Sequence, residues 1–346
     1  MAHLVSADYS HPIAQLTYRP GRGPTDYPDI YRIHVECREA DQTDLLSTFE
    51  FYHGRVASVG DIAHYFAYCD HAEDVLIAET GTKMIGYARA GQARDWGAGV
   101  NSYWVDVLVT PYWRGKGIED RLLTWLETRS HEIQKARPDN HYVLTAAASS
   151  LAHCHRLLLE RSGYRLFRNH DDLALDTFEG LPKAEVIHGV HLRAAGKEDF
   201  RQVWDQCVQS MLEAYPTSGF GSEADYEAWC GSSSLSHRLS WAAWSGDQVV
   251  GVILSELRDV PVGDDTVCCG TVDQLEVSKE WRRKGIARAL LLSSLAAMSG
   301  AGATVARIHT PTDNSYGACT LYQSVGFRLV KQQGYYVKEC APPTTP

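Results

Sequence analysis

The sequence predicts an α/β protein built from two tandem domains. Its 346 residues are enough for two domains of about 150 residues each. Apolar runs rich in β-branched residues alternate with stretches of helical spacing, which indicates strands followed by helices. The same short landmarks also occur twice in the same order, which indicates an internal duplication.

The duplication is defined by four pairs of landmarks. One pair lies in a predicted β-hairpin, with a turn around Gly81 in the first copy and around Gly246 in the second. The two members of each pair are 155 to 168 residues apart, so the spacing is nearly constant. The pairs are Arg38 and Arg193, Gly86 and Gly251, Arg114 and Arg282, and Gly163 and Gly326.

The join between the copies lies near residues 180–183, before Val190 starts the second copy. The segment before about Tyr31 is rich in Pro and Gly, so we expect an arm that is partly disordered. We therefore predict an N-terminal arm over residues 1–30, a first domain over residues 31–180 and a second domain over residues 188–340.

The second copy contains a strand, a basic turn and a helix in succession. The strand is predicted over residues 272–277 and the helix over residues 286–298. Residues 282–287 of the turn fit the spacing [Gln/Arg]-x-x-Gly-x-[Gly/Ala]. Free N–H groups at a helix N-terminus favour a pyrophosphate, and Gly285 and Ala287 leave room for one. A solvated helix start is the alternative interpretation.

A second motif follows in residues 308–327. We predict a strand, a loop carrying Asn314, a short helix bearing Tyr322, and a turn at Gly326-Phe327 into a last strand. Together with the basic turn, this pattern resembles the GNAT (Gcn5-related) N-acetyltransferase superfamily. The resemblance implies that each half is a GNAT domain, an α+β unit with a mixed, mostly antiparallel sheet flanked by helices. It also implies acetyl-CoA as cosubstrate and an amine as acceptor.

The first copy departs from this pattern at each chemical position. Glu119 stands where the second copy has Ala287, and its bulk and charge oppose a pyrophosphate. Leucines and a valine replace the other candidate residues. The chain is similar to tandem GNAT proteins such as mycothiol synthase, which implies a catalytic C-terminal half and a structural N-terminal half. Residual CoA binding by the first half stays open. The aligned pairs are Leu159 and Tyr322, Leu151 and Asn314, and Val105 and Asp273.

The resemblance also implies which residues hold acetyl-CoA. The pantetheine chain would bond to the strand at residues 275–277, with a backbone N–H near Leu275 facing the thioester oxygen. The pyrophosphate would lie on the amides of residues 283–288. Asn314 would contact the pantetheine, or else form an ordinary Asx turn. The full set is Leu275, Glu276, Val277, Arg282, Arg283, Lys284, Gly285, Ile286, Ala287, Arg288, Asn314 and Ala318.

Two residues are candidates for proton transfer. The resemblance implies Tyr322 as the acid that protonates the CoA thiolate, with a core aromatic residue as the alternative. The usual position of the base holds Thr271, which cannot accept the proton. Asp273 lies two residues further, on the same strand face by the period of two, and is our candidate base. Glu276 falls on the other face by the same rule, and a weakly basic acceptor would need no base.

The acceptor is expected to contact the helices that precede the second sheet. Apolar residues of helical spacing begin at Phe200, and an aromatic loop follows over residues 215–221. That loop either covers the acceptor or is a plain connector. The candidate acceptor residues are Glu213, Tyr215 and Phe220.

Composition excludes several other classes of protein. The net charge of −10 argues against a general nucleic-acid binder. There is no apolar run of about 18 residues and no secretory pattern at the start, so we expect no membrane association. Nine scattered cysteines indicate thiols in a cytoplasmic protein. The run His153-Cys154-His155 has no second ligand pair, so we expect no metal site.

The leading hypothesis is therefore an acetyl-CoA-dependent N-acetyltransferase that acts on a small-molecule amine. Transfer would be direct, because Cys319 has no histidine partner that would make it an acyl carrier. The alternatives are a CoA-binding regulator or scaffold without turnover, and a protein N-acetyltransferase. We expect a monomer or a homodimer.

Overall fold

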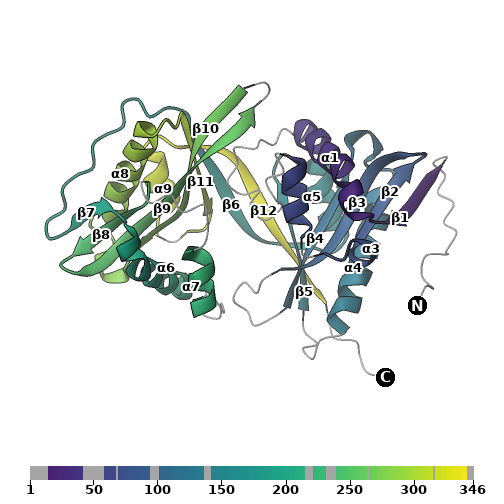
Figure 1. The fold of residues 1–346 in the computed structure, drawn as a ribbon, viewed down its shortest axis with the longest axis horizontal. Helices are drawn as coiled ribbons and strands as arrows, with labels where there is room; N and C mark the ends of the chain where they lie inside the picture. Colours follow the sequence, from purple (N-terminus) through teal and green to yellow (C-terminus); the bar gives the residue numbers. More distant parts are fainter. Residues whose placement is uncertain are drawn as a thin grey trace.

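The computed structural model contains one continuous sheet of twelve strands (Figure 1). Their order is β1-β2-β3-β4-β5-β12-β6-β11-β10-β9-β8-β7. Among these pairings β4 with β5 and β10 with β11 are parallel, and the others are antiparallel. The structure describes residues 15–41, 58–67, 69–93, 101–135, 142–214, 221–230, 239–262, 265–314 and 316–340.

The first half has the element order that the landmarks predict. A hairpin and a long strand precede the helix that follows the first basic turn. The elements are β1 (Leu16–Pro20), η1 (Gly23–Thr25), α1 (Tyr27–Ala40), α2 (Val59–Tyr65), α3 (His71–Asp74), β2 (Val75–Thr80), β3 (Lys83–Ala93), β4 (Asn101–Val109), η3 (Pro111–Trp113), α4 (Ile118–Lys135), β5 (Tyr142–Ser149), α5 (His153–Arg161) and β6 (Arg165–Leu175).

The second half repeats this order, which confirms the duplication at the level of structure. Both predicted hairpins are present, as β2–β3 and β8–β9. The elements are β7 (His191–Ala194), η4 (Lys197–Asp199), α6 (Phe200–Ala214), α7 (Glu223–Cys230), β8 (Trp241–Ser245), β9 (Gln248–Val262), β10 (Asp265–Val277), η5 (Lys279–Trp281), α8 (Ile286–Gly300), β11 (Val305–Pro311), α9 (Ala318–Gln323) and β12 (Arg328–Cys340).

The two halves exchange their last strands. Strand β6 belongs to the first half in sequence but pairs with β11 of the second half. Strand β12 belongs to the second half but pairs with β5 of the first. The two exchanged strands also pair with each other and join the halves in the middle of the sheet (Figure 1). The predicted join near residues 180–183 therefore does not divide the sheet into two.

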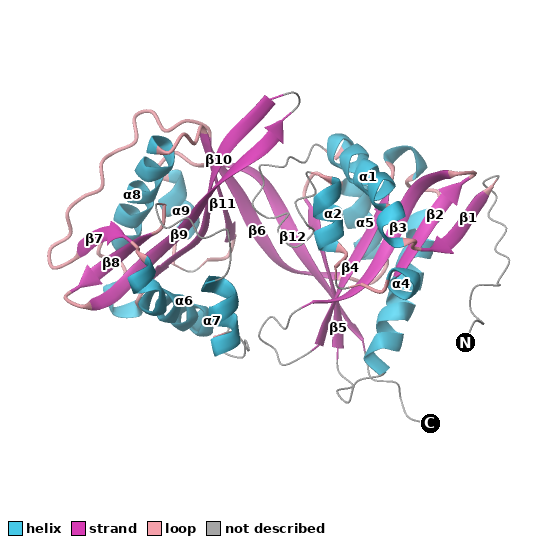
Figure 2. Cartoon of the chain, in the orientation of Figure 1, coloured by secondary structure: helices cyan, strands magenta, loops and turns pink. Residues whose placement is uncertain are grey.

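Helices cover the sheet within each half (Figure 2). In the first half, α1 and α2 form one buried cluster with β2 and β3, while α4 and α5 form another with β4 and β5. In the second half, α6 packs on β8 and β9, and α8 and α9 pack with β10 and β11. The helix α8 is mostly apolar, which suits its burial.

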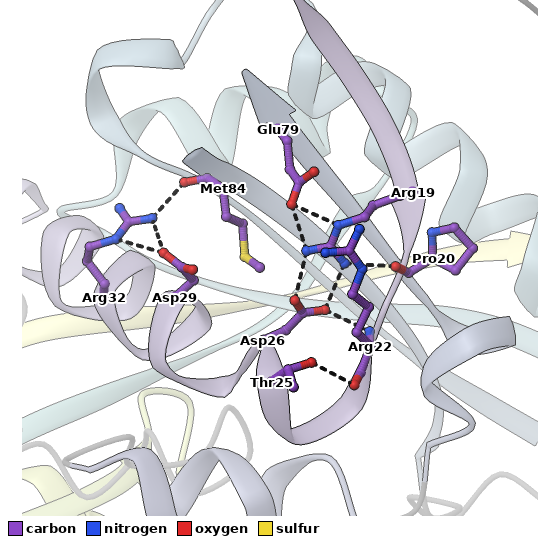
Figure 3. Close-up of polar contacts among 9 residues, drawn as sticks. All are labelled: Arg19, Pro20, Arg22, Thr25, Asp26, Asp29, Arg32, Glu79 and Met84. Carbon is purple, nitrogen blue, oxygen red and sulfur yellow. Dashed lines mark hydrogen bonds and ion pairs between the residues drawn. The ribbon is translucent and has the colours of Figure 1, made fainter. Parts of the chain in front are cut away.

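Residues 16–30 are folded into the first half and do not form the arm that the Pro and Gly content predicts. Strand β1 pairs antiparallel with β2 over its whole length. The guanidinium of Arg19 lies between the carboxylates of Asp26 and Glu79 and donates hydrogen bonds to both (Figure 3). Proline is compatible with these positions because Pro20 ends an edge strand and Pro24 lies in the first turn of η1.

Candidate functional site

The candidate site lies where β10 and β11 diverge. These parallel strands pair only from Cys269 to Val272 on β10 and from Val305 to Ile308 on β11. Beyond Val272, β10 continues along β9 alone. The separation exposes the last residues of β10 on the side that β11 has left, which opens a place for an extended ligand to bond to the backbone.

A β-bulge at Asp273 lies at the start of this separation. Val272 pairs with Ser255 and Gln274 pairs with Leu254, so Asp273 is the extra residue on β10. A bulge shifts the alternation of side chains by one residue. The period of two that places Asp273 on the face of Thr271 is therefore wrong across this position, and the Asp273 side chain is exposed.

The residue that shares the face of Thr271 is Glu276. It pairs with Val252, which is part of the buried cluster beneath α6. Burial raises the pKa of the Glu276 carboxyl to about 7, while Arg282 and a hydrogen bond with Ser210 act in the opposite direction. A carboxyl group with this pKa exchanges a proton near neutral pH.

A chain of hydrogen bonds from α6 orients this carboxyl group. The hydroxyl of Ser278 donates to Oε1 of Gln206 at 2.6 Å. The amide of Gln206 donates to Oγ of Ser210 at 3.2 Å, and Ser210 bonds to Glu276. All three of these partners are buried. Sequence reasoning did not identify Gln206 and Ser210 because their spacing on α6 is that of an ordinary amphipathic helix.

Arg282 is a structural anchor of the loop that follows β10. Its Nε donates to the carbonyl oxygen of Val277 at 2.9 Å, and its guanidinium forms an ion pair with Glu213 of α6. The ring of Tyr316 lies 4.3 Å from its guanidinium carbon. The side chains of Arg282 and Glu213 thus bind each other and fix the loop to α6.

The loop itself presents backbone N–H groups. Arg283 and Gly285 adopt left-handed φ values of 63° and 86°, which turn the chain sharply into α8. Within the described residues, the N–H groups of residues 283–288 have no acceptor. The ammonium group of Lys284 lies over the ring of Trp281, and Arg288 bonds to Ser324. This arrangement fits the pyrophosphate that the sequence predicts on the amides of residues 283–288, which include Ile286 and Ala287.

Tyr322 lies on α9 within the buried cluster that α8 forms with β10 and β11. The side chain is only 6% exposed and its ring packs on Phe327 in the cluster under α8. Burial and the nearby carboxylate of Glu276 raise the pKa of the phenol. Tyr322 thus lies within electrostatic range of Glu276, which the sequence predicts as a cofactor-binding residue and not as the base.

The remaining predicted residues have local roles. Oδ1 of Asn314 accepts a hydrogen bond from the N–H of Tyr316 at 2.9 Å, which is an Asx turn. Ala318 is the first residue of α9. The thiol of Cys319 donates to Asp171, and burial together with this carboxylate raises its pKa to about 11. Tyr215 and Phe220 lie outside the described residues.

Comparison with known proteins identifies the fold family. A sequence profile described as the Acetyltransferase (GNAT) family matches residues 27–157 and 204–327, which together are more than half of the chain. The chain belongs to the GNAT acetyltransferase family. It is therefore an acyltransferase, and GNAT enzymes generally use acetyl-CoA and require an acceptor. No protein of curated function matches the chain.

Solved structures share this double GNAT architecture. A GCN5-related N-acetyltransferase from Sphaerobacter thermophilus is 20% identical, with 95% of this chain and 96% of that chain aligned and a TM-score of 0.75. A tandem GNAT protein from the clavulanic acid biosynthesis pathway is 15% identical, with 94% and 99% aligned and a TM-score of 0.61. A glucosamine N-acetyltransferase region of a fungal β-N-acetylglucosaminidase gives 11% identity, a TM-score of 0.66, and alignment of 94% of this chain with 38% of that chain.

The first GNAT copy has the same turn but fills it with its own side chain. Gly115 and Gly117 adopt left-handed φ values of 72° and 84°, as Arg283 and Gly285 do in the second copy. Arg114 donates to the carbonyl oxygen of Val109 at 3.0 Å, as Arg282 does to Val277. However, Oε1 of Glu119 accepts the N–H of Gly115 at 2.9 Å.

The described part of the chain lacks two other classes of feature. None of its helices is long and apolar enough to cross a membrane. No group of three or more His, Cys, Asp or Glu side chains there could hold a metal ion.

Proposed function

We propose that this protein is an acetyl-CoA-dependent N-acetyltransferase that acts on a small-molecule amine in its second GNAT copy. The observation that carries the proposal is the half-buried carboxyl of Glu276, beyond the point where the pairing of β10 and β11 ends, together with its electrostatic effect on the phenol of Tyr322. A proton acceptor and a proton donor thus flank the place where an extended thioester would bond to β10. The free N–H groups of residues 283–288 lie at the end of the same strand.

Glu276 rather than Asp273 is the base in this proposal. The amine nitrogen must lose a proton as it attacks the thioester carbon, and a carboxylate of pKa about 7 accepts one efficiently at neutral pH. Hydrogen bonds from α6 hold Glu276 in one orientation. Asp273 is exposed on the bulge and faces away from this arrangement.

Tyr322 is the acid in this proposal. As the carbon–sulfur bond breaks, the CoA sulfur takes the phenolic proton, and the carbon–nitrogen bond of the amide product forms. Transfer is direct, because the raised pKa of Cys319 keeps its thiol protonated and poorly nucleophilic. The half-buried position of Glu276 beneath α6 supports a narrow acceptor such as a small amine.

The setting of the reaction is also a proposal. All nine cysteines are free thiols, which supports a reducing, cytoplasmic compartment. We propose a monomer or a homodimer, since the exchanged strands already join the two sheets within one chain.

The function is tested by screening amines with acetyl-CoA and measuring release of the CoA thiol. We expect at least one small primary amine to be acetylated at a rate that is proportional to the enzyme concentration. Tyr322→Phe should lower kcat by about 10- to 100-fold, because it removes only the phenolic proton. Acetyl-CoA affinity, measured by calorimetry, should stay the same. Unchanged kcat would remove Tyr322 from the reaction, and acetylation confined to protein lysines would reject the small-molecule acceptor.

A further inference from the structure

The face of β10 that carries Glu276 also carries a buried amide oxygen. Gln274 and Glu276 are two residues apart and both follow the bulge, so their side chains leave the same face of the strand. The residues that pair with them on β9, Leu254 and Val252, belong to the buried cluster beneath α6. Within the described residues, the buried Oε1 of Gln274 has no hydrogen-bond partner. Such an oxygen is costly to bury, so it points to a ligand that supplies a donor.

The other polar side chains of this face already have partners. Arg258 of β9 donates to Oγ1 of Thr271 at 3.2 Å and lies 3.4 Å from the carboxylate of Glu256. Glu276 forms a hydrogen bond with a serine of α6. Gln274 therefore differs from its neighbours on the face, although it lies among them.

The first GNAT copy has a partner at the equivalent position. Asp106 of β4 is the equivalent of Gln274, since each lies three residues before the end of its strand. Arg89 of β3 pairs with Asp106, as Leu254 of β9 pairs with Gln274. Nε of Arg89 donates to the buried carboxylate of Asp106 at 3.0 Å. Leu254 has no polar group, so the strand opposite supplies no donor in the copy that carries Glu276.

The charges of this face determine which group Gln274 would bind. Its amide oxygen needs a hydrogen-bond donor. The carboxylates of Glu256 and Glu276 lie on the same face and disfavour an anion there. The amine of the acceptor is assigned to Glu276, and a second cation would have to be buried without a carboxylate of its own. A hydroxyl group donates a hydrogen bond and adds no charge.

The spacing of the two side chains limits the ligand further. Neighbouring residues on one face of a strand are about 6.5 Å apart, and Gln and Glu side chains have the same length. Each hydrogen bond covers about 2.9 Å, so a short spacer joins the two groups of the ligand. We propose that the acceptor is an amino alcohol, whose hydroxyl group lies two or three carbon atoms from the amine and donates to Oε1 of Gln274. This inference rests on the proposed function, because the amine is placed at Glu276.

The test compares two amino alcohols with alkyl amines of the same size. The pairs are ethanolamine with propylamine and 3-amino-1-propanol with butylamine. Each compound is titrated into the full-length protein with excess CoA, and binding is followed by ligand-observed NMR. CoA has no acetyl group, so binding is measured without turnover. We expect at least one amino alcohol to bind at least tenfold more tightly than its alkyl amine, which would leave Oε1 of Gln274 unsatisfied.

Two glutamine variants assign this preference to Gln274. Gln274→Met keeps the length of the side chain but removes the amide, so it should bind the amino alcohol at least tenfold more weakly and the alkyl amine like the wild type. Gln248→Met is the matched control at an exposed glutamine of β9, and should keep the preference. Thermal melts check that both variants are folded.

The outcomes separate this inference from the proposed function. Equal binding of both members of each pair, no binding of either amino alcohol, or a wild-type preference in Gln274→Met would each overturn the inference. The same amines are then assayed with acetyl-CoA for release of the CoA thiol. An amino alcohol that binds through Gln274 but is not acetylated would reject the transfer step and keep the binding site.

Discussion

Strands β4 and β10 occupy equivalent places in the two GNAT copies but differ by one bulge. Strand β10 carries an extra residue at Asp273, whereas the pairing of β4 with β3 is continuous from Ser102 to Val109. In β10, Glu276 faces α6, and in β4 the equivalent position is Leu108, which packs against the cluster of α1 and α2. The comparison shows that the two copies share the sheet, but that only the second copy has a carboxylate at this position.

The two turns differ in a second way. Both copies keep the left-handed residues and the bond from an arginine to a strand carbonyl, at Arg114 and Arg282. Each arginine also pairs with an acid of the helix on that side, Asp41 or Glu213. These contacts stabilise the turn without any ligand. The shape of the turn is therefore no proof of CoA binding, and we expect the residue at position 119 or 287 to decide whether CoA binds.

The largest expected effect is on acetyl-CoA affinity, and it distinguishes the turn of the second copy from that of the first. Gly285→Glu should reduce acetyl-CoA affinity by more than about 100-fold, because a carboxylate would stand beside the amides that face the pyrophosphate. Gly117→Glu introduces the same strain, since both glycines have a left-handed φ, of 86° and 84°. It should leave affinity and stoichiometry unchanged. Calorimetry measures both, and equal losses in the two variants would mean that the copies are alike in binding CoA.

The next largest expected effect is a loss of activity when the carboxylate of Glu276, which β4 lacks at the equivalent position, is removed. Glu276→Gln should lower kcat/KM by about 100- to 1,000-fold above pH 8, where the wild-type carboxyl is ionised and can accept the proton. Because its pKa is about 7, the wild-type enzyme loses this advantage as the pH falls below 7. The measurement is the ratio of wild-type to variant kcat/KM at each pH. Ionisation of the acceptor amine affects both enzymes equally, so it cancels in this ratio.

Asp273→Asn is the control for this measurement. It removes an exposed carboxylate three residues away on the same strand, and we expect little change in activity. A large loss in Asp273→Asn together with an active Glu276→Gln would restore Asp273 as the base.

The smallest expected effect is a gain of acetyl-CoA binding in the first copy. Glu119→Ala frees the N–H of Gly115 and places an alanine where the second copy has Ala287. We expect a weak second site for acetyl-CoA by calorimetry, in addition to the site in the second copy. A stoichiometry that remains one at millimolar acetyl-CoA would mean that other differences, such as Leu159, also keep CoA out.

Several features of the fold could be predicted from the sequence because they depend on local chemistry. The hairpin turns at Gly81 and Gly246, the helix that starts after Gly285 and the short helix with Tyr322 each follow from a few adjacent residues. The GNAT family and the duplication follow from the same motifs and are confirmed. The roles of Tyr322, of Asp273 and of the loop residues in catalysis and binding stay predictions.

The features that could not be predicted depend on contacts between residues that are distant in the sequence. The bulge at Asp273 is defined only by the register of β9 against β10, so no pattern within residues 272–277 reveals it. The ion pair of Arg282 with Glu213 joins residues 69 positions apart. The exchange of β6 and β12 was also beyond prediction, because either order satisfies the same apolar alternation in each strand.

The strand exchange also bears on how the chain can be made and divided. Strand β5 has β4 on one side but lacks its second neighbour until residues 328–340 have been synthesised, so the first half cannot complete its sheet while it emerges from the ribosome. Strand β6, by contrast, exists early and exposes a row of unpaired backbone groups until β11 and β12 arrive. Contacts over such long sequence separations slow folding. Fragments cut at the linker would each carry the strand that the other needs, and would be expected to recover a native sheet only when mixed.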